Sequence, residues 1–166
     1  MGAKTAISVD EYLYTSFPGI DCEYRDGELV ERSIPDYVHG HAQAVIASLF
    51  EPLRRKLPVY GCISTRMKLR EGLYLIPDVA AFWPSAPAIS VPDSPPLIAV
   101  EIVSPDDRLT AVREKLHEYH TWGVPHVWLV DPCSRRLYTC DSKLAEVNSF
   151  SVPELSLTLT PAEIFD

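Results

Sequence analysis

The sequence predicts an α/β fold in which a mixed β-sheet is flanked by helices. Two long segments carry apolar residues at helical spacing, and short apolar runs of strand character lie between and after them. One of these runs is linked through a helix to the next, as in a right-handed βαβ crossover. A chain of 166 residues can form one compact domain but is short for two, so we expect a single domain over residues 1–166.

The first third of the chain contains three predicted elements. Ser8-Val-Asp-Glu11 has the pattern of a capping box and predicts a short helix. The segment CEYRDGELVERS alternates polar and apolar residues around Asp26-Gly27, which is a strong hairpin signal. Apolar residues then recur at helical spacing from Asp36 to Lys56, and Pro58 closes this segment. We expect a helix, a hairpin and a long amphipathic helix in that order.

Three strands are predicted in the middle of the chain, over Val59–Leu69, Leu73–Trp83 and Leu97–Ser104. The segment between the last two, PSAPAISVPDSPP, is rich in proline and favours an extended loop with little regular pairing. A loop of this length in a small domain is more often functional, or a cover for a sheet edge, than accidental.

A second amphipathic helix is expected after the third strand. Asp106 and Asp107 are predicted to cap its N-terminus, the apolar spacing continues to about Trp122, and Gly123 stops it. The next segment, Pro125–Asp131, is a continuous apolar run typical of a strand covered on both faces.

The C-terminal part completes the predicted sheet. RLYTC is expected to return antiparallel to the preceding strand, and the tail to form a further short strand and a last helical turn capped by Thr160. The centre of the sheet should consist of the strands that contain Asp78 and Glu101, together with the strand over 125–131.

The overall charge restricts the partners of this chain. The formal net charge is −8 and the isoelectric point is near 5.1. Because binding to phosphate usually leaves a basic footprint, this charge argues against a surface built mainly for nucleic acid. A local basic groove, or one formed by two subunits, is compatible with it, and for that reason we expect a homodimer.

Composition also bears on location and redox state. No apolar run reaches the roughly 18 residues needed to cross a bilayer, and MGAKTAISVDEYL lacks the apolar core of a secretory signal. We therefore expect a cytoplasmic protein without a membrane span. The cysteines form no CxxC pair, which favours small buried residues over disulfides or zinc ligands. A disulfide between Cys133 and Cys140 is a minor alternative.

Two carboxylates embedded in apolar strands are the strongest functional signal. Asp78 lies in IPDVAAF and Glu101 lies in LIAVEIVSP. An ionised carboxylate in a segment built for burial is costly unless a cation compensates it, so two of them suggest one shared cation. Mg²⁺ is held by one or two carboxylates together with substrate phosphates, and the backbone carbonyl of Ile102 is a natural third ligand. Lys115, on the following helix, is within reach of the same site.

The order of these motifs resembles a known group of nucleases. An acidic residue in CEYRDGELV is followed by the helix VHGHAQAVIASL, by YLIPDVAAF, by PPLIAVEIVSP and by KLHEYHTWGVPHVWLVDP. This order resembles the PD-(D/E)XK nuclease superfamily, and more narrowly the Uma-type putative restriction endonuclease family, over about residues 8–140. The resemblance implies a restriction-endonuclease-like core and an endonuclease that hydrolyses DNA phosphodiester bonds with Mg²⁺, for which Mn²⁺ can substitute.

The resemblance also implies roles for individual acids. Asp78 and Glu101 are the implied metal ligands, and Glu23 matches the N-terminal acidic position of the family, from which it is expected to contact the metal through water. The chemistry agrees with these roles, because phosphodiester hydrolysis needs a divalent ion that neutralises phosphoryl charge and lowers the pKa of a bound water.

The lysine of the superfamily motif is displaced in this chain. The superfamily has a lysine two residues after the strand glutamate, where this sequence has Val103. The resemblance implies that Lys115, on the next helix, takes the role of that lysine. Lys68 and Arg66, on the neighbouring strand, are fallbacks for the same role.

Each candidate also has a plainer interpretation. The two strand carboxylates could simply face solvent at the ends of their strands. Lys115 could be a solvated partner of Glu118, and Glu23 could pair with Arg25 or Arg32 within the hairpin.

Histidines and aromatic residues give weaker signals. His39 is interpreted as a packing residue in the first turn of the long helix, with a metal or proton-carrying role as the alternative. His117 and His120 have helical spacing for zinc but lack an evident third ligand. Tyr119 is assigned to the core, and Trp83 is a candidate platform for a stacked base.

Two functions from different classes fit the sequence. The first is the metal-dependent endonuclease that the resemblance implies. The second is a binding or assembly module that has kept the fold without cutting. The acidic composition and Val103 favour the second, whereas the intact pair of Asp78 and Glu101 favours the first, and fold analogy alone does not decide between them.

Overall fold

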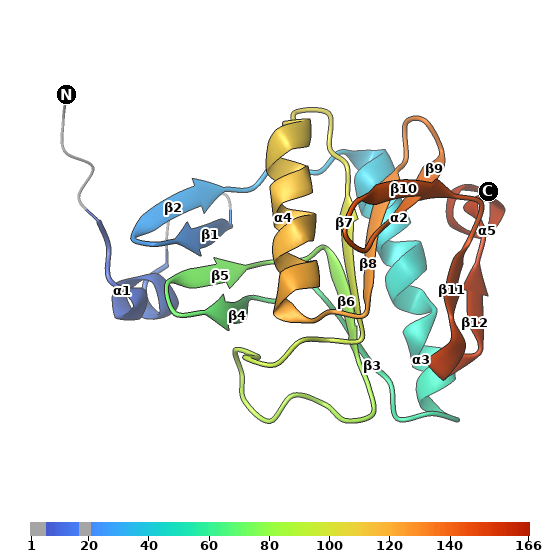
Figure 1. The fold of residues 1–166 in the computed structure, drawn as a ribbon, viewed down its shortest axis with the longest axis horizontal. Coiled ribbons are helices and arrows are strands. Elements are labelled where there is room, and N and C mark those ends of the chain that lie inside the picture. Colours follow the sequence, from blue (N-terminus) through green and yellow to red (C-terminus); the bar gives the residue numbers. More distant parts are fainter. Residues whose placement is uncertain (1–5, 17–20) are drawn as a thin grey trace.

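The computed structural model describes residues 6–16 and 21–166, and it contains the predicted mixed sheet between helices (Figure 1). Within these residues the central sheet has six strands, in the order β10 (Leu144–Val147), β9 (Arg136–Cys140), β8 (His126–Asp131), β7 (Ile98–Ile102), β6 (Val79–Phe82) and β3 (Tyr60–Ile63). β7 and β8 pair in parallel and are joined by α4 (Leu109–Trp122), as the sequence predicts. The other neighbouring pairs are antiparallel, which makes the sheet mixed.

A smaller sheet stands beside the central one (Figure 1). Its strands, in the described part of the chain, follow the order β2 (Glu28–Glu31), β1 (Cys22–Arg25), β5 (Leu73–Leu75) and β4 (Met67–Arg70). β1 and β2 form the predicted hairpin, and both Asp26 and Gly27 have positive φ angles, as a tight hairpin turn requires. The short helix α1 (Val9–Tyr14) packs on this sheet through Tyr12, whose ring stacks on Tyr24.

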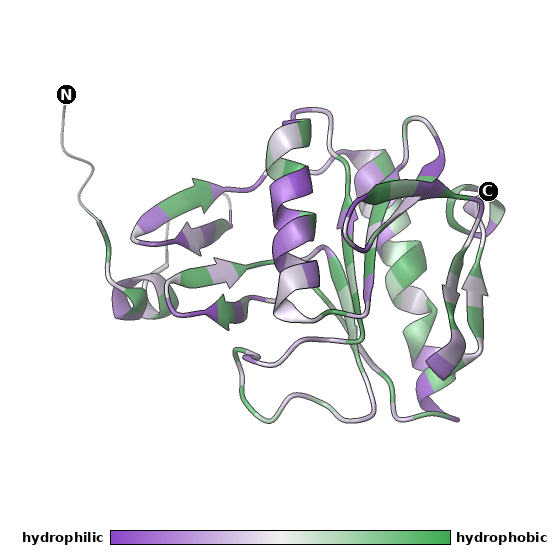
Figure 2. Cartoon of the chain, viewed as in Figure 1, coloured by the Kyte–Doolittle hydropathy of each residue, from purple (hydrophilic) through white to green (hydrophobic). Residues whose placement is uncertain are grey.

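The middle strands β6, β7 and β8 of the central sheet are buried on both faces, which fixes the direction of each side chain in β7. Val100 packs with Ile46 of α2 (Tyr37–Ser48) on one face, and Ala99 packs with Leu116 of α4 on the other. Figure 2 shows these strands as largely hydrophobic, whereas the visible face of α4 is hydrophilic. Since side chains alternate along a strand, Glu101 shares the face of Ala99 and points toward α4.

Two of the three predicted central strands are each divided between the two sheets. Val59–Leu69 becomes β3 and β4, with Ser64 at a positive φ of 45° between them, and Leu73–Trp83 becomes β5 and β6. Pro77 lies between β5 and β6, where its missing N–H prevents continuous pairing. Pro77 therefore separates the two strands, and Asp78 lies directly before β6.

The long helix predicted from Asp36 to Lys56 is two helices, α2 and α3 (Phe50–Arg54), which meet at Leu49. The predicted start is correct, because the Asp36 side chain accepts a hydrogen bond from the backbone N–H of His39 at 2.9 Å. The break follows from Pro52, which has no N–H to donate to the carbonyl four residues earlier and whose ring crowds that carbonyl.

The predicted capping of α4 by Asp106 and Asp107 is wrong. The residue that precedes the helix is Arg108, and its side chain makes no capping hydrogen bond. Asp107 instead accepts hydrogen bonds from the backbone N–H of Ser104 at 2.7 Å and from the hydroxyl of Ser33 at 2.5 Å. The predicted end is correct, because Gly123 adopts a left-handed φ of 105°.

The tail contains more structure than the sequence predicts. The sequence predicts one further short strand, whereas the structure has β10 and the hairpin of β11 (Phe150–Val152) and β12 (Leu157–Leu159). α5 (Pro161–Phe165) has the predicted cap at Thr160, reinforced by Glu163. The Phe150 ring stacks on Trp128 of β8 with centroids 4.1 Å apart, which attaches the hairpin to the core.

The cysteines and the helices bear on the predictions about disulfides and membrane spans. Cys140 is buried as expected, but Cys133 is exposed, and these two described residues form no disulfide with each other. In the described part of the chain, none of the helices combines the length and the apolar character needed to cross a membrane.

Candidate active site

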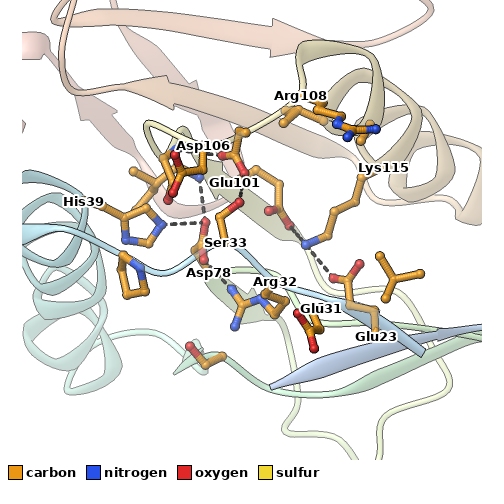
Figure 3. A pocket seen from close by; sticks show the side chains of 18 of the residues that line it. Glu23, Glu31, Arg32, Ser33, His39, Asp78, Glu101, Asp106, Arg108 and Lys115 are labelled. Carbon is orange, nitrogen blue, oxygen red and sulfur yellow. Dashed lines mark hydrogen bonds and ion pairs between the residues drawn. The ribbon is translucent and has the colours of Figure 1, made fainter. Parts of the chain in front are cut away.

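The sequence-predicted site residues lie around one cavity of about 550 Å³ (Figure 3). The cavity opens where β6 begins and β7 ends, between the β1–β2 hairpin, α2 and α4. Its lining includes Glu23, Asp78, Glu101, Ile102 and Lys115. Residues that are up to 92 positions apart in the chain therefore meet at one point of the fold.

Antiparallel pairing of β6 with β7 explains why the two strand acids meet. Val79 is opposite Val100, so the next position along this register brings Asp78 to Glu101. Asp78 is then held by the backbone of the neighbouring strand, because the N–H of Ile102 donates a hydrogen bond to Asp78 Oδ2 at 2.7 Å. Both acids are buried, so the interpretation that they face solvent is wrong.

Asp78 is surrounded by cationic and polar groups. Arg32 Nη2 lies 2.5 Å from Asp78 Oδ1, and His39 Nε2 lies 3.3 Å from Oδ2. Burial alone would raise the pKa of Asp78, but the hydrogen bond from His39 and the charges of Lys115 and Arg32 outweigh burial and lower that pKa. Asp78 is therefore an ionised carboxylate at neutral pH.

Lys115 joins two of the acids. Its Nζ lies 2.6 Å from Glu23 Oε1 and 2.8 Å from Glu101 Oε1, and it donates a hydrogen bond to the carbonyl of Ile76 at 3.0 Å. Burial alone would lower the pKa of Lys115, but the charges of Glu101, Glu23 and Asp78 raise it above its ordinary value. Lys115 is thus an ammonium with only 11% of its side chain exposed, and not the solvated helix residue of the plainer interpretation.

The pKa of Glu101 is shifted in the opposite direction from that of Asp78. Burial raises the pKa of Glu101 to about 8, with a smaller contribution from Asp78 and Glu23, and Lys115 only partly offsets this rise. The Tyr119 hydroxyl donates a hydrogen bond to Glu101 Oε1 at 2.9 Å. Because Lys115 and Tyr119 are four residues apart on α4, one helix face presents both to Glu101.

Glu23 is fixed by the chain segment between the two sheets. Its Oε1 accepts a hydrogen bond from the backbone N–H of Ile76 at 2.9 Å, beside the contact with Lys115. Pairing of Glu23 with Arg25 does not occur, since Arg25 binds Glu118 on α4 at 2.7 Å.

The donor set of the cavity fits a hard divalent cation. Seven acidic and four basic side chains line the cavity, so its lining is acidic overall. Carboxylate and carbonyl oxygens are the ligands that Mg²⁺ prefers, and Asp78, Glu101 and the backbone of Ile102 adjoin one another here. Among residues 6–16 and 21–166, no three such side chains already converge as ligands, because Arg32 and Lys115 hold the acids.

The alternative candidates lie elsewhere. Lys68 pairs with Glu71 on the surface, and Arg66 stacks over the ring of Tyr12, so neither fallback for the lysine lines the cavity. His117 is exposed on α4, and its Nε2 lies 3.5 Å from the hydroxyl of Thr121.

Sequence reasoning missed three contributors to the site. Arg32 and Tyr119 contact the two strand acids, and Gln43 of α2 donates a hydrogen bond from Nε2 to the carbonyl of Asp78 at 2.8 Å. The spacing of Lys115 and Tyr119 on one helix face is a signal that could have identified Tyr119. Arg32 and Gln43 carry no such signal, since their contacts depend on how the hairpin and α2 pack.

Comparisons with known proteins place these observations in context. The model of the Uma2 family, described as "Putative restriction endonuclease", matches residues 9–164. A crystal structure of a putative nuclease belonging to DUF820 from Anabaena variabilis ATCC 29413 is similar, with a TM-score of 0.82 and 20% sequence identity over 96% of this chain and 97% of that chain. At this identity the likeness shows the fold. No curated protein matches the chain.

Proposed function

The chain belongs to the Uma2 family of putative restriction endonucleases, and from this premise we propose that it is a divalent-metal-dependent endonuclease that hydrolyses phosphodiester bonds in DNA. The observation that carries the proposal is the meeting of buried Asp78 and Glu101 in one acidic cavity, with Lys115 against Glu101. The cofactor is Mg²⁺, for which Mn²⁺ can substitute.

Asp78, Glu101 and the carbonyl of Ile102 would hold the ion in this proposal. A bound Mg²⁺ supplies neutralisation of the phosphoryl oxygens and lowers the pKa of a bound water. Glu23 and Glu101 both contact the ammonium of Lys115, and Glu23 would contact the ion through water. The acidic lining supports a cation-first order of binding, because phosphate approaching without a cation would meet net negative charge.

Lys115 would take the place of the lysine that Val103 replaces. Because its pKa is raised, Lys115 stays protonated and acts as a hydrogen-bond donor and positive charge, and not as a general base. Its contacts with Glu23, Glu101 and Ile76 fix the ammonium beside the proposed metal ligands. There it would orient the attacking water and stabilise negative charge that develops on the phosphoryl group.

One observation favours the second candidate, a binding or assembly module without cleavage activity. Arg32 and Lys115 already compensate much of the acidic charge in the cavity, so the site is held together by the chain's own cations. In either case we propose a cytoplasmic homodimer, in which two subunits frame the DNA, and light scattering of the purified chain tests the dimer against its monomer mass of 18.6 kDa.

Metal binding and cleavage together test the proposed function. Mn²⁺ should raise the melting temperature of the native chain and of Asp141→Ala, an exposed control, but not that of Asp78→Ala. With Mn²⁺ present, the native chain should nick plasmid DNA and Glu101→Ala should not. Equal nicking by both proteins would mark the activity as contamination, and flat Mn²⁺ titrations of all three proteins would contradict the metal-dependent enzyme.

A further inference from the structure

Arg32 is a cation in direct contact with Asp78. Its guanidinium Nη2 lies 2.5 Å from Asp78 Oδ1, and its side chain is only 18% exposed. The other oxygen, Oδ2, accepts the hydrogen bond from the Ile102 N–H and faces His39. Both oxygens of Asp78 are therefore already engaged, and Oδ1 is engaged by a side chain that can move.

The position of Arg32 in the chain allows such movement. Arg32 directly follows β2, which is an edge strand of the smaller sheet, and its backbone N–H is anchored to the carbonyl of Asp21 at 3.1 Å. The backbone is thus held while the long side chain reaches into the cavity. His39 and the Ile102 N–H are in contrast fixed by α2 and β7.

A divalent ion at Oδ1 would compete with the Arg32 guanidinium for the negative charge of Asp78. The two positive charges would repel each other at contact distance in a buried cavity, where solvent screens poorly. The cavity that would receive the substrate phosphate is lined by Arg32 itself, so a guanidinium displaced from Asp78 stays within it. Arginine donates paired hydrogen bonds to phosphate oxygens in the same manner as to carboxylates.

We propose that Arg32 is an exchangeable counter-ion: it neutralises Asp78 before metal binds, yields Oδ1 to the divalent ion, and then binds a phosphate oxygen of the DNA. This inference rests on the proposed function and deepens it by assigning a substrate-binding residue. It predicts opposite effects of one substitution, tighter metal binding and weaker DNA binding. A purely structural ion pair would instead lose both together.

Calorimetric titration with Mn²⁺ alone tests the first half of the inference. Arg32→Gln should bind Mn²⁺ about tenfold more tightly than the native chain, since it removes a competitor worth about 1.4 kcal/mol. Arg25→Gln is the matched control, because Arg25 lines the same cavity but pairs with Glu118. Its Mn²⁺ affinity should stay within twofold of the native value. Equal or weaker Mn²⁺ binding by Arg32→Gln would overturn the inference.

DNA binding in Ca²⁺, which permits binding without relying on cleavage, tests the second half. Arg32→Gln should bind a duplex oligonucleotide at least fivefold more weakly despite its tighter metal binding. Unchanged DNA affinity would overturn the phosphate role. If the native chain binds Mn²⁺ through Asp78 and Arg32→Gln gains nothing, this inference fails while the proposed function stands. If neither protein binds Mn²⁺, the proposed function fails as well.

The native protein offers a test that does not depend on the folding of a variant. In the chain labelled with ¹⁵N-arginine, saturating Mg²⁺ should shift the side-chain Nε–H resonance of Arg32 and leave that of Arg25 in place. An unmoved Arg32 resonance under Mg²⁺ saturation would overturn the exchange.

Discussion

Glu101 shows how burial controls charge in this site. Three carboxylates, Glu23, Asp78 and Glu101, share the cavity with the two cations Arg32 and Lys115. The described acids therefore exceed these cations by one, and Glu101 keeps a proton because burial disfavours its ionised form. Counted over its whole lining, the cavity is still acidic, and this acidity makes it attractive to an added cation.

The Glu101 proton makes metal-free stability depend on pH. The pKa of Glu101 is about 8 in the folded chain against an ordinary 4.5, so between these values the folded state holds a proton that the unfolded state has lost. The free energy of unfolding should therefore fall, by up to about 1.4 kcal/mol per pH unit from this group, as pH rises through that window. Urea denaturation in EDTA at pH 5.5 and 7.5 measures the effect.

Glu101→Gln is the comparison for this pH dependence. Glutamine cannot ionise, so the stability of the variant relative to the native chain should increase from pH 5.5 to pH 7.5. Parallel changes in the two proteins across this range would show that Glu101 is ionised throughout and that the proposed charge state is incorrect.

Lys115 compensates two buried acids, and its removal should be costly. Lys115→Met leaves Glu23 and Glu101 without their shared ammonium and should lower the free energy of unfolding by on the order of 3 kcal/mol. Lys143→Met, at an exposed position, is the control and should change stability little. Added Mn²⁺ should restore part of the loss in Lys115→Met, and urea denaturation of both variants with and without Mn²⁺ checks this. Equal stability of the two variants would contradict the compensating role.

At the scale of secondary-structure elements, the site depends on two loops that are fastened to each other. The segment between β2 and α2 contains Ser33, and the segment between β7 and α4 contains Ser104 and Asp107. Asp107 accepts hydrogen bonds from both serines and so joins the two segments at the cavity. The carboxylate of Asp107, which the sequence predicts as a helix cap, instead joins two segments that border the cavity.

Substitution of neighbouring aspartates separates these two roles. Asp107→Ala should lower the free energy of unfolding by about 1–3 kcal/mol, because it leaves the Ser104 N–H and the Ser33 hydroxyl without their acceptor. Asp106→Ala changes an exposed neighbour and should cost less than about 0.5 kcal/mol. Thermal or urea denaturation measures both. Similar losses in the two variants would indicate a general helix-end charge effect and not the Asp107 contacts.

The elements that the sequence predicts well are those set by local pattern. The hairpin at Asp26-Gly27, the start of α2 at Asp36 and the end of α4 at Gly123 each depend on a few adjacent residues. The division of two predicted strands between two sheets depends on which distant strand each half pairs with, and alternation of apolar residues does not contain that information. Proline was the available clue, at Pro77 and at Pro52.

The same distinction explains the site. Asp78 and Glu101 stand out because a carboxylate in an apolar strand is conspicuous in any sequence. Arg32 and Tyr119 are missed because an arginine after a hairpin and a tyrosine on an apolar helix face have ordinary structural explanations. Their contacts with the acids arise only when the hairpin and α4 pack over the ends of β6 and β7.

At the scale of the whole molecule, family membership and fold agree, and the negative charge of the chain bears on how the proposed DNA substrate reaches the site. The Uma2 match spans residues 9–164 and so includes the tail beyond residue 140, where the motif-based resemblance ends. A net charge of −8 and an acidic cavity lining disfavour the approach of the proposed DNA substrate unless cations are present. This condition ties the proposed substrate to the proposed cofactor.

Anomalous diffraction from crystals soaked in Mn²⁺ locates the ion directly. We predict one strong peak in contact with the carboxylates of both Asp78 and Glu101, with the guanidinium of Arg32 moved away from Asp78. A Mn²⁺ ion bound elsewhere in the molecule, or no ion in the cavity at concentrations that saturate the thermal shift, would contradict the shared-cation account.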